Sequence, residues 1–267
     1  MKIKVILIGL SIQVSMLLIV ACNSQSQASL HYDQGSALLD KGQYQMAIME
    51  YNKAIDLDPA FATAYNNRGF AYFSIGQHLL ALQDYDKAID LDPDLAIAYS
   101  NRGAHYYGHG EIQLALQDLN KAIQIDPDYS NSYSERGSMY FMEGEYELAF
   151  QDYGKALELD PDDAEAYRLR AAYYSDKSEY QLSIGDYNRS IELDPDDADA
   201  YDERGAVYFM QGEYQLALGD YDKAIELNPY LATAYGNRGS LYYLQGEFQL
   251  ALQDLNKAIQ IDPDYSN

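Results

Sequence analysis

The chain has 267 residues, 48% of them hydrophobic, so it is long enough and apolar enough to bury a core. Its 42 acidic and 18 basic residues give a net charge of −24, which disfavours nucleic acid as a partner because phosphate binding requires clustered lysine and arginine. The single cysteine excludes an intramolecular disulfide.

The chain begins with a segment typical of exported proteins. Two lysines among the first four residues precede an uncharged apolar run over 5–21, which is short for a membrane span and suits a signal peptide. The run leads into Cys22 in the sequence IVAC, which resembles the lipobox of bacterial lipoproteins. The resemblance implies that residues 1–21 are cleaved and that acylated Cys22 anchors the chain to a membrane of the bacterial cell envelope, with 22–27 as a polar tether. An ordinary secretory signal or an uncleaved anchor is the alternative.

The rest of the chain is a repeat with a period of 34 residues. All seven prolines are separated by this interval, at positions 59, 93, 127, 161, 195, 229 and 263. Such regularity indicates a repeat array. We number the repeats 1 to 7, over 28–61, 62–95, 96–129, 130–163, 164–197, 198–231 and 232–265, and call the first residue of each position 1.

Each repeat predicts two short amphipathic helices joined by a turn. In repeat 2, residues with the spacing of one helical face are Tyr65, Gly69 and Tyr72 in the first helix, and Ala81, Tyr85 and Ala88 in the second. Gly76 breaks the first helix and Pro93 ends the second. Neither helix can bury its apolar face alone, so neighbouring repeats must stack.

This pattern closely resembles the tetratricopeptide repeat family over residues 28–265. The small residues at positions 8 and 20 and the period itself carry the resemblance. It implies an all-α fold, a right-handed α-solenoid of seven helix–turn–helix repeats, whose first helices line a groove for protein or peptide segments. The function implied is a binding scaffold or assembly factor rather than an enzyme.

Position 7, usually apolar in this family, is arginine in six repeats, and the same six repeats have aspartate at position 23. The pairs are Arg68 with Asp84, Arg102 with Asp118, Arg136 with Asp152, Arg170 with Asp186, Arg204 with Asp220, and Arg238 with Asp254. We expect an ion pair between the two helices of each of these repeats. The alternative is that both side chains point to solvent.

Repeat 5 departs most from the pattern. Ser178 replaces the turn glycine, and Ser183 and Ser190 replace the two alanines of the second helix. We expect both of these hydroxyls to bond to the preceding helical turn. Sequence drift and a weak joint in the array are the two interpretations.

The sequence LALQDLNKAIQIDPDYSN occurs at 114–131 and again at 250–267, which indicates a block duplication. Repeat 7 is not followed by a capping element, which solenoids normally have. We therefore expect either a truncated chain or an apolar face that docks on a partner or on a second copy, and the latter would make the protein a self-associating structural protein.

The resemblance places the ligand-binding residues at positions 5, 6, 12 and 13. The candidates are Asn66 and Arg168 at position 5; Asn67, Asn101 and Asn237 at position 6; Phe73, Tyr107, Phe141, Phe209 and Tyr243 at position 12; and Met142, Met210 and Leu244 at position 13. We expect an aromatic and methionine stripe with polar edges, suited to an extended or helical peptide. Side chains at position 12 either line this groove or pack between repeats, whereas position 13 is expected to be exposed.

Residues at positions 5, 6 and 9 bear on two modes of peptide binding that are known in the family. Position 5 has no lysine and position 9 no asparagine, so the clamp that grips the C-terminal carboxylate of chaperones is disfavoured. The asparagines at position 6 form part of a ladder that in other members holds a peptide backbone.

Signals for catalysis, metals and cofactors are absent from the sequence. His105 and His109 have i, i+4 spacing, but Tyr106 stands where a metalloprotease would have glutamate. The run DLDPD at 90–94 lacks the glycine and the glutamate of a calcium loop. We expect its acidic residues to act in turns and as helix N-caps.

Overall fold

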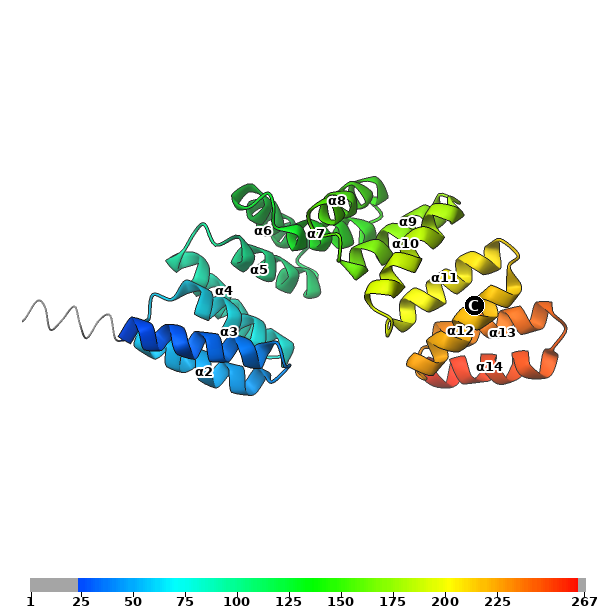
Figure 1. The fold of residues 1–267 in the computed structure, drawn as a ribbon, viewed down its shortest axis with the longest axis horizontal. Coiled ribbons are helices and arrows are strands. Elements are labelled where there is room, and N and C mark those ends of the chain that lie inside the picture. Colours follow the sequence, from blue (N-terminus) through cyan, green and yellow to red (C-terminus); the bar gives the residue numbers. More distant parts are fainter. Residues whose placement is uncertain (1–23, 264–267) are drawn as a thin grey trace, which may run out of the picture. The chain divides into compact units, whose positions relative to one another are not determined.

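The computed structural model describes residues 24–263, which fold into helices joined by short turns and include no β-strand (Figure 1). A helix over 24–39 comes first. The others are α2 (Tyr44–Leu57), α3 (Ala62–Ser74), α4 (His78–Leu91), α5 (Ala96–Gly108), α6 (Ile112–Ile125), α7 (Ser130–Met142), α8 (Tyr146–Leu159), α9 (Ala164–Asp176), α10 (Tyr180–Leu193), α11 (Ala198–Met210), α12 (Tyr214–Leu227), α13 (Ala232–Leu244) and α14 (Phe248–Ile261). The expected all-α solenoid of seven helix–turn–helix repeats is therefore confirmed.

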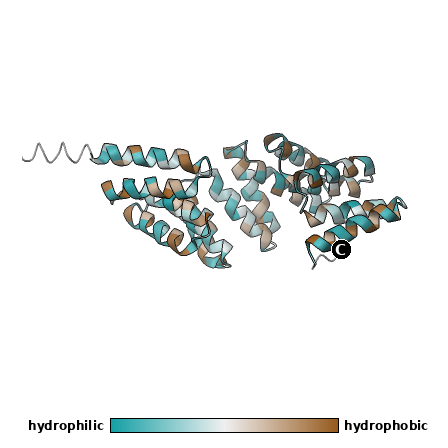
Figure 2. Ribbon diagram, turned by 90° about the horizontal axis from the view of Figure 1, so that it is seen from below, coloured by the Kyte–Doolittle hydropathy of each residue, from teal (hydrophilic) through white to brown (hydrophobic). Residues whose placement is uncertain are grey.

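The chain divides into two compact bodies, an N-terminal body that ends at Glu135 and a C-terminal body that begins at Arg136. Within each body the two helices of a repeat pack together, as α3 does on α4 and α11 on α12. The second helix also packs on the first helix of the next repeat, as α4 does on α5. Figure 2 shows hydrophilic and hydrophobic residues interspersed along the helices, as this two-sided packing requires.

Glycine at position 8 allows the two helices of a repeat to approach closely. A Cβ atom on Gly137 would lie 2.7 Å from the ring of Tyr153, whose side chain is fully buried. The alanines at positions 20 and 27 of the same repeat, Ala149 and Ala156, are also fully buried. The small residues therefore make the space that the aromatic ring of the second helix fills.

The turn between the two helices requires a left-handed residue at position 15. Six repeats have glycine there with φ between 67° and 81°, whereas Ser178 of repeat 5 adopts φ 59°. A side chain in this region costs roughly 1–2 kcal/mol. Repeat 5 therefore keeps the turn at the expense of backbone strain.

The Arg–Asp pair predicted from the sequence is confirmed in all six repeats. The Nε and Nη2 atoms of each arginine donate to the two carboxylate oxygens at 2.7–2.9 Å. In repeat 6 the carboxylate of Asp220 is 7% exposed and Arg204 is largely buried. The pair is therefore a buried bidentate link between the first and second helices.

Each arginine makes further contacts that the sequence analysis missed. The Nη1 atom of Arg204 donates to Oδ1 of Asn188 in the preceding repeat at 2.7 Å. Its guanidinium carbon lies 5.5 and 5.8 Å from the ring centroids of Tyr201 and Tyr208, within the range of cation–π attraction. One side chain therefore connects both helices of its own repeat to the second helix of the repeat before it.

Residues 24–27, which we placed in the polar tether, are helical, consistent with the good helix propensity of glutamine. The bonds expected for the two serines of α10 were wrong. Ser183 donates to the carbonyl of Ala171 on α9 at 2.9 Å rather than to its own preceding turn, because the two helices are in close contact there. The Ser190 hydroxyl has no hydrogen-bond partner among the described residues.

The acidic residues before the prolines act in turns, as expected: Asp92, for example, accepts from the backbone nitrogen of Asp94 at 3.1 Å. The expected N-caps are confirmed only at Asp163 and Asp197, which begin α9 and α11. In repeats 2, 3 and 7 an apolar residue occupies the N-cap position.

The signal peptide and Cys22 lie outside the described residues. Between residues 24 and 263, none of the helices has the length and apolar character needed to cross a membrane.

We predict that Arg204→Met lowers the free energy of unfolding by about 3–5 kcal/mol, because the buried Asp220 carboxylate loses its partner. Urea denaturation followed by circular dichroism measures this. The control is Arg189→Met, since the ion pairs of Arg189 with Asp162 and Glu192 are exposed and its removal should leave the midpoint unchanged. Equal effects of the two substitutions would contradict a structural role for the buried pair.

Candidate protein-binding surface

A ladder of hydrogen bonds runs along the first helices within each body. In each rung, the residue at position 6 of one repeat bonds to the residue at position 5 of the repeat before it. The rungs are Asn67 to Tyr32 (3.1 Å), Asn101 to Asn66 (2.9 Å), Glu135 to Ser100 (2.6 Å), Glu203 to Arg168 (3.0 Å) and Asn237 to Asp202 (2.9 Å). These bonds join neighbouring repeats.

The ladder corrects the assignment of position 5 to an exposed polar edge of the groove. Asn66 is 1% exposed, Asp202 is 5% exposed, and Ser100 is fully buried. The side-chain amides of Asn67 and Asn101 are used in contacts with the preceding repeat. The asparagines at position 6 therefore hold neighbouring repeats together.

The rung of Arg168 carries charge. Arg168 lies between two carboxylates, with Nη1 3.0 Å from Oε1 of Glu203 and Nε 3.4 Å from Oδ2 of Asp197. Burial raises the pKa of Glu203 above its ordinary value, and the adjacent guanidinium opposes this shift. Arg168 therefore joins α9 to α11, and its predicted role in ligand binding stays a prediction.

We predict that Asn101→Ala destabilises the fold by about 1–2 kcal/mol, because the buried oxygen of Asn66 loses its donor. The same substitution should leave peptide binding unchanged. Asn256→Ala, at an exposed position on α14, is the matched control and should alter neither property. A loss of binding with unchanged stability in Asn101→Ala would instead support a backbone-gripping ladder.

Exposed apolar side chains lie at the C-terminal ends of α7, α11 and α13 in the C-terminal body, whereas α9, between α7 and α11, has Ser175 and Asp176 at these positions. We call this surface the apolar edge; it consists of Met142, Met210, Tyr243 and Leu244, which are 71%, 65%, 62% and 59% exposed. The expected exposure of position 13 is confirmed for all three candidates. Large apolar side chains exposed to this degree are typical of interaction surfaces when they are contiguous.

Aromatic pairs support the apolar edge. Rings at position 12 contact rings at position 17, at the start of the second helix: Phe141 with Tyr146, Phe209 with Tyr214, and Tyr243 with Phe248, at centroid distances of 5.2, 5.8 and 5.6 Å. The rings of Phe141 and Phe209 are half-buried by these contacts. Both rings therefore pack against the second helix of their own repeat, and Phe209 also packs against the cluster that contains Leu241 of repeat 7, whereas Tyr243 is exposed.

In the N-terminal body, position 12 is half-buried. Phe73 lies 5.4 and 5.9 Å from the ring centroids of His78 and His105, and Tyr107 is also only partly exposed. Position 13 of repeats 1 to 3 is Asp40, Ser74 and Gly108. The apolar edge is therefore a feature of the C-terminal body.

The sequence analysis missed a second set of exposed apolar side chains. Position 19 holds leucine or methionine in all seven repeats, and each is 41–54% exposed: Met46, Leu80, Leu114, Leu148, Leu182, Leu216 and Leu250. The recurrence was visible in the sequence, but a leucine next to the buried alanine of position 20 suggests core packing. These residues lie on the second helices, away from the ladder.

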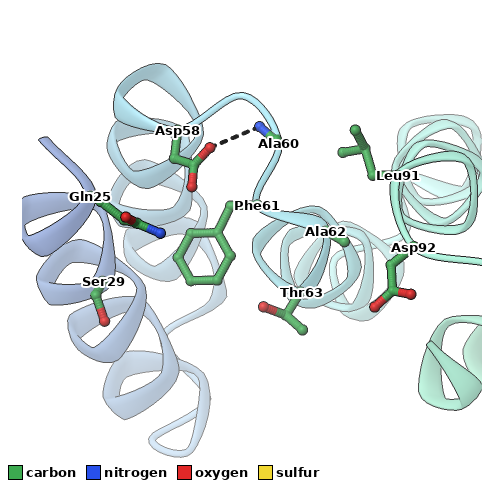
Figure 3. Close-up of a pocket in the computed structure, with 9 residues that line it drawn as sticks. All are labelled: Gln25, Ser29, Asp58, Ala60, Phe61, Ala62, Thr63, Leu91 and Asp92. Atoms are coloured by element: carbon green, nitrogen blue, oxygen red, sulfur yellow. Dashed lines mark hydrogen bonds between the residues drawn. The ribbon is translucent and has the colours of Figure 1, made fainter. Parts of the chain in front are cut away.

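The lining of a hollow in the N-terminal body does not resemble a catalytic or cofactor site. This hollow of about 490 Å³ lies against the turn before α3, where Gln25, Phe61 and Thr63 line it (Figure 3). Asp58, which also lines it, already accepts a hydrogen bond from the nitrogen of Ala60 at 3.0 Å. Over residues 24–263, no three histidine, cysteine or acidic side chains are placed to hold a metal ion.

Solved structures share this architecture. YrrB, described as a TPR protein with an unusual peptide-binding site, is 26% identical, with a TM-score of 0.55 over 68% of this chain and 93% of its own. A tetratricopeptide repeat protein from Parabacteroides merdae is 25% identical, with a TM-score of 0.62 over 89% and 94% of the two chains. The APC/C hetero-tetramer Cut9–Hcn1 matches with a TM-score of 0.77 at 18% identity, which shows the fold alone, and this chain spans 46% of that one.

A search of curated proteins finds no match. Models of protein families do match the sequence. The model described as TPR repeat matches residues 35–76, 137–177, 172–212 and 205–246, and the model described as tetratricopeptide repeat matches 62–95, 96–129 and 232–265. The matches cover well over half of the sequence, and the chain belongs to the tetratricopeptide repeat family.

Proposed function

We propose that the chain is a membrane-anchored scaffold or assembly factor of the bacterial cell envelope, and that it binds segments of partner proteins through the apolar edge. The observation that carries this proposal is the exposure of Met142 on α7, Met210 on α11, and Tyr243 and Leu244 on α13. Tetratricopeptide repeat proteins are generally non-catalytic scaffolds, and a binding role without catalysis is what we propose here.

The chemistry of the apolar edge suits a peptide with bulky apolar side chains. Methionine is flexible and polarisable, so it adapts to varied partners, and the aromatic pairs beneath it give the surface a fixed support. The peptide-binding site named for YrrB, which has a similar fold, supports a peptide as the ligand.

The negative net charge of both bodies indicates the charge of the partner. Residues 136–263 contain 26 acidic and 10 basic residues, a net charge of −16, whereas residues 24–135 contain 15 and 6, a net charge of −9. A negative surface attracts positive partners and repels negative ones. We therefore expect a partner segment in which basic residues flank the apolar ones.

The binding test uses a triple variant, Met142→Ser, Met210→Ser and Leu244→Ser, in a crosslinking pulldown from membranes. We expect it to lose the partners that the wild type captures, because the apolar contact area is removed. The matched control is Leu182→Ser, Leu216→Ser and Leu250→Ser, which removes three aliphatic side chains, 43–53% exposed, from the second helices and should retain the partners. A partner list unchanged in the first variant would rule out the apolar edge.

The anchoring test uses Cys22→Ser. We expect the wild type to incorporate labelled fatty acid and to sediment with membranes, and the variant to do neither, because multiple acyl chains are needed for stable anchoring. Ser24→Ala, two residues away, should behave as the wild type. A wild type that carries no label would contradict lipidation.

Self-association is the second candidate function. Leu252 and Ile259 on α14 are 57% and 52% exposed, whereas their equivalents in repeat 1, Ile48 and Ile55, are 9% and 8% exposed, and Ile55 packs with Ala64 of the following helix. These two side chains offer an apolar surface to a second copy. Light scattering over a concentration series distinguishes the two functions, since a strict monomer would exclude self-association.

A further inference from the structure

Three of the four histidines of the chain lie together in the N-terminal body, although they come from two repeats. His78 is the first residue of α4, His105 lies in α5, and His109 directly follows α5. The ring centroids of His105 and His109 are 4.4 Å apart in a stacked arrangement, and the His78 ring lies 6.0 and 4.9 Å from them. The cluster therefore sits at the joint between α4 and α5.

His105 occupies a site that is apolar elsewhere in the array. It is 5% exposed, and the described residues provide no hydrogen-bond partner for its Nδ1 atom. In four other repeats the residue at this position is apolar and at most 1% exposed: Ala71, Met139, Val207 and Leu241. Ala37 of repeat 1 is exposed, and Tyr173 of repeat 5 is half-buried. A neutral imidazole fits such a site, whereas a cation would be buried without an acceptor.

We propose that the three histidines form a proton-sensitive joint, in which protonation of His105 on acidification loosens the packing of repeat 2 against repeat 3. The added proton places a charge in an apolar site. The rings of His109 and His78, 4.4 and 6.0 Å from the His105 ring, add to the unfavourable surroundings of that charge.

The groups around His105 shift its pKa in opposite directions. Burial first, then His109 and His78, lower the pKa of His105, while Glu111 before α6 and Asp86 on α4 oppose the shift. Asp86 is paired with Arg102 at 2.6 Å. In the pH range in which histidine titrates, Arg102 stays charged and the neighbouring Tyr106 stays neutral. Phe73 of α3, the remaining ring in contact, carries no charge.

The sign of the pH effect follows from this lowered pKa. Between the folded value and the ordinary value of about 6.5, the unfolded chain binds a proton at His105 and the folded chain does not. Stability from this group is therefore present at neutral pH and is lost as the pH falls below about 6.5. Because α5 also carries Ser100 and Asn101, loosening it would disturb two rungs of the ladder.

The test compares the wild type with His105→Met, which copies Met139, the residue at this position in repeat 4. Between pH 7.5 and 5.5 we expect the melting temperature of the wild type to fall by about 2–4 °C more than that of the variant. Hydrogen exchange locates the effect: protection of α4 and α5 relative to α11 and α12 should fall on acidification in the wild type only.

A direct titration needs no variant. The ring-proton resonance of His105, followed by NMR, should titrate below the ordinary value for histidine. Equal pH dependence of the wild type and His105→Met, or titration of His105 at or above the ordinary value, would overturn the proposal. Should His105→Met fold poorly, His105→Val, which copies Val207, replaces it.

Discussion

The arginine at position 7 is the side chain on which the packing of each repeat from 2 to 7 depends. It joins the two helices of its repeat through a bidentate bond to a nearly buried aspartate, and it lies between two tyrosine rings, as Arg204 lies between Tyr201 and Tyr208. Where the preceding repeat offers an acceptor, as Asn188 does, the same guanidinium also reaches that repeat. The charge of the guanidinium is tolerated in a helix interface because the group bonds to a carboxylate at its edge and contacts aromatic rings.

The first helices use their polar residues in a similar way. The ladder at positions 5 and 6 resembles a peptide-gripping array in sequence, yet its amides and carboxylates bond to one another across repeats. Because these polar groups bond between repeats, the side chains that remain exposed are the candidates for contacts with a partner. In the C-terminal body these are the methionines, leucine and tyrosine of the apolar edge, which supports our assignment of binding to that surface.

The period of 34 residues was enough to predict the helices, the turns and the stacking, because each repeat tests the same pattern again. The Arg–Asp pair was also predictable, since both residues lie in one repeat and occur together in six. The rungs of the ladder were missed because their members lie 35 residues apart in different repeats. The histidine cluster was missed for the same reason: His78 comes from a different repeat than His105 and His109, and only packing brings them together.

The central claim is that partners contact the apolar edge while the ladder remains internal. Site-specific photocrosslinking tests it most directly, with a photoreactive residue placed in turn at Met210 on the apolar edge, Asn237 in the ladder and Leu216 on the second helix of the same repeat. The account predicts a partner adduct at position 210, and none at 237 or 216. An adduct at 237 without one at 210 would contradict it.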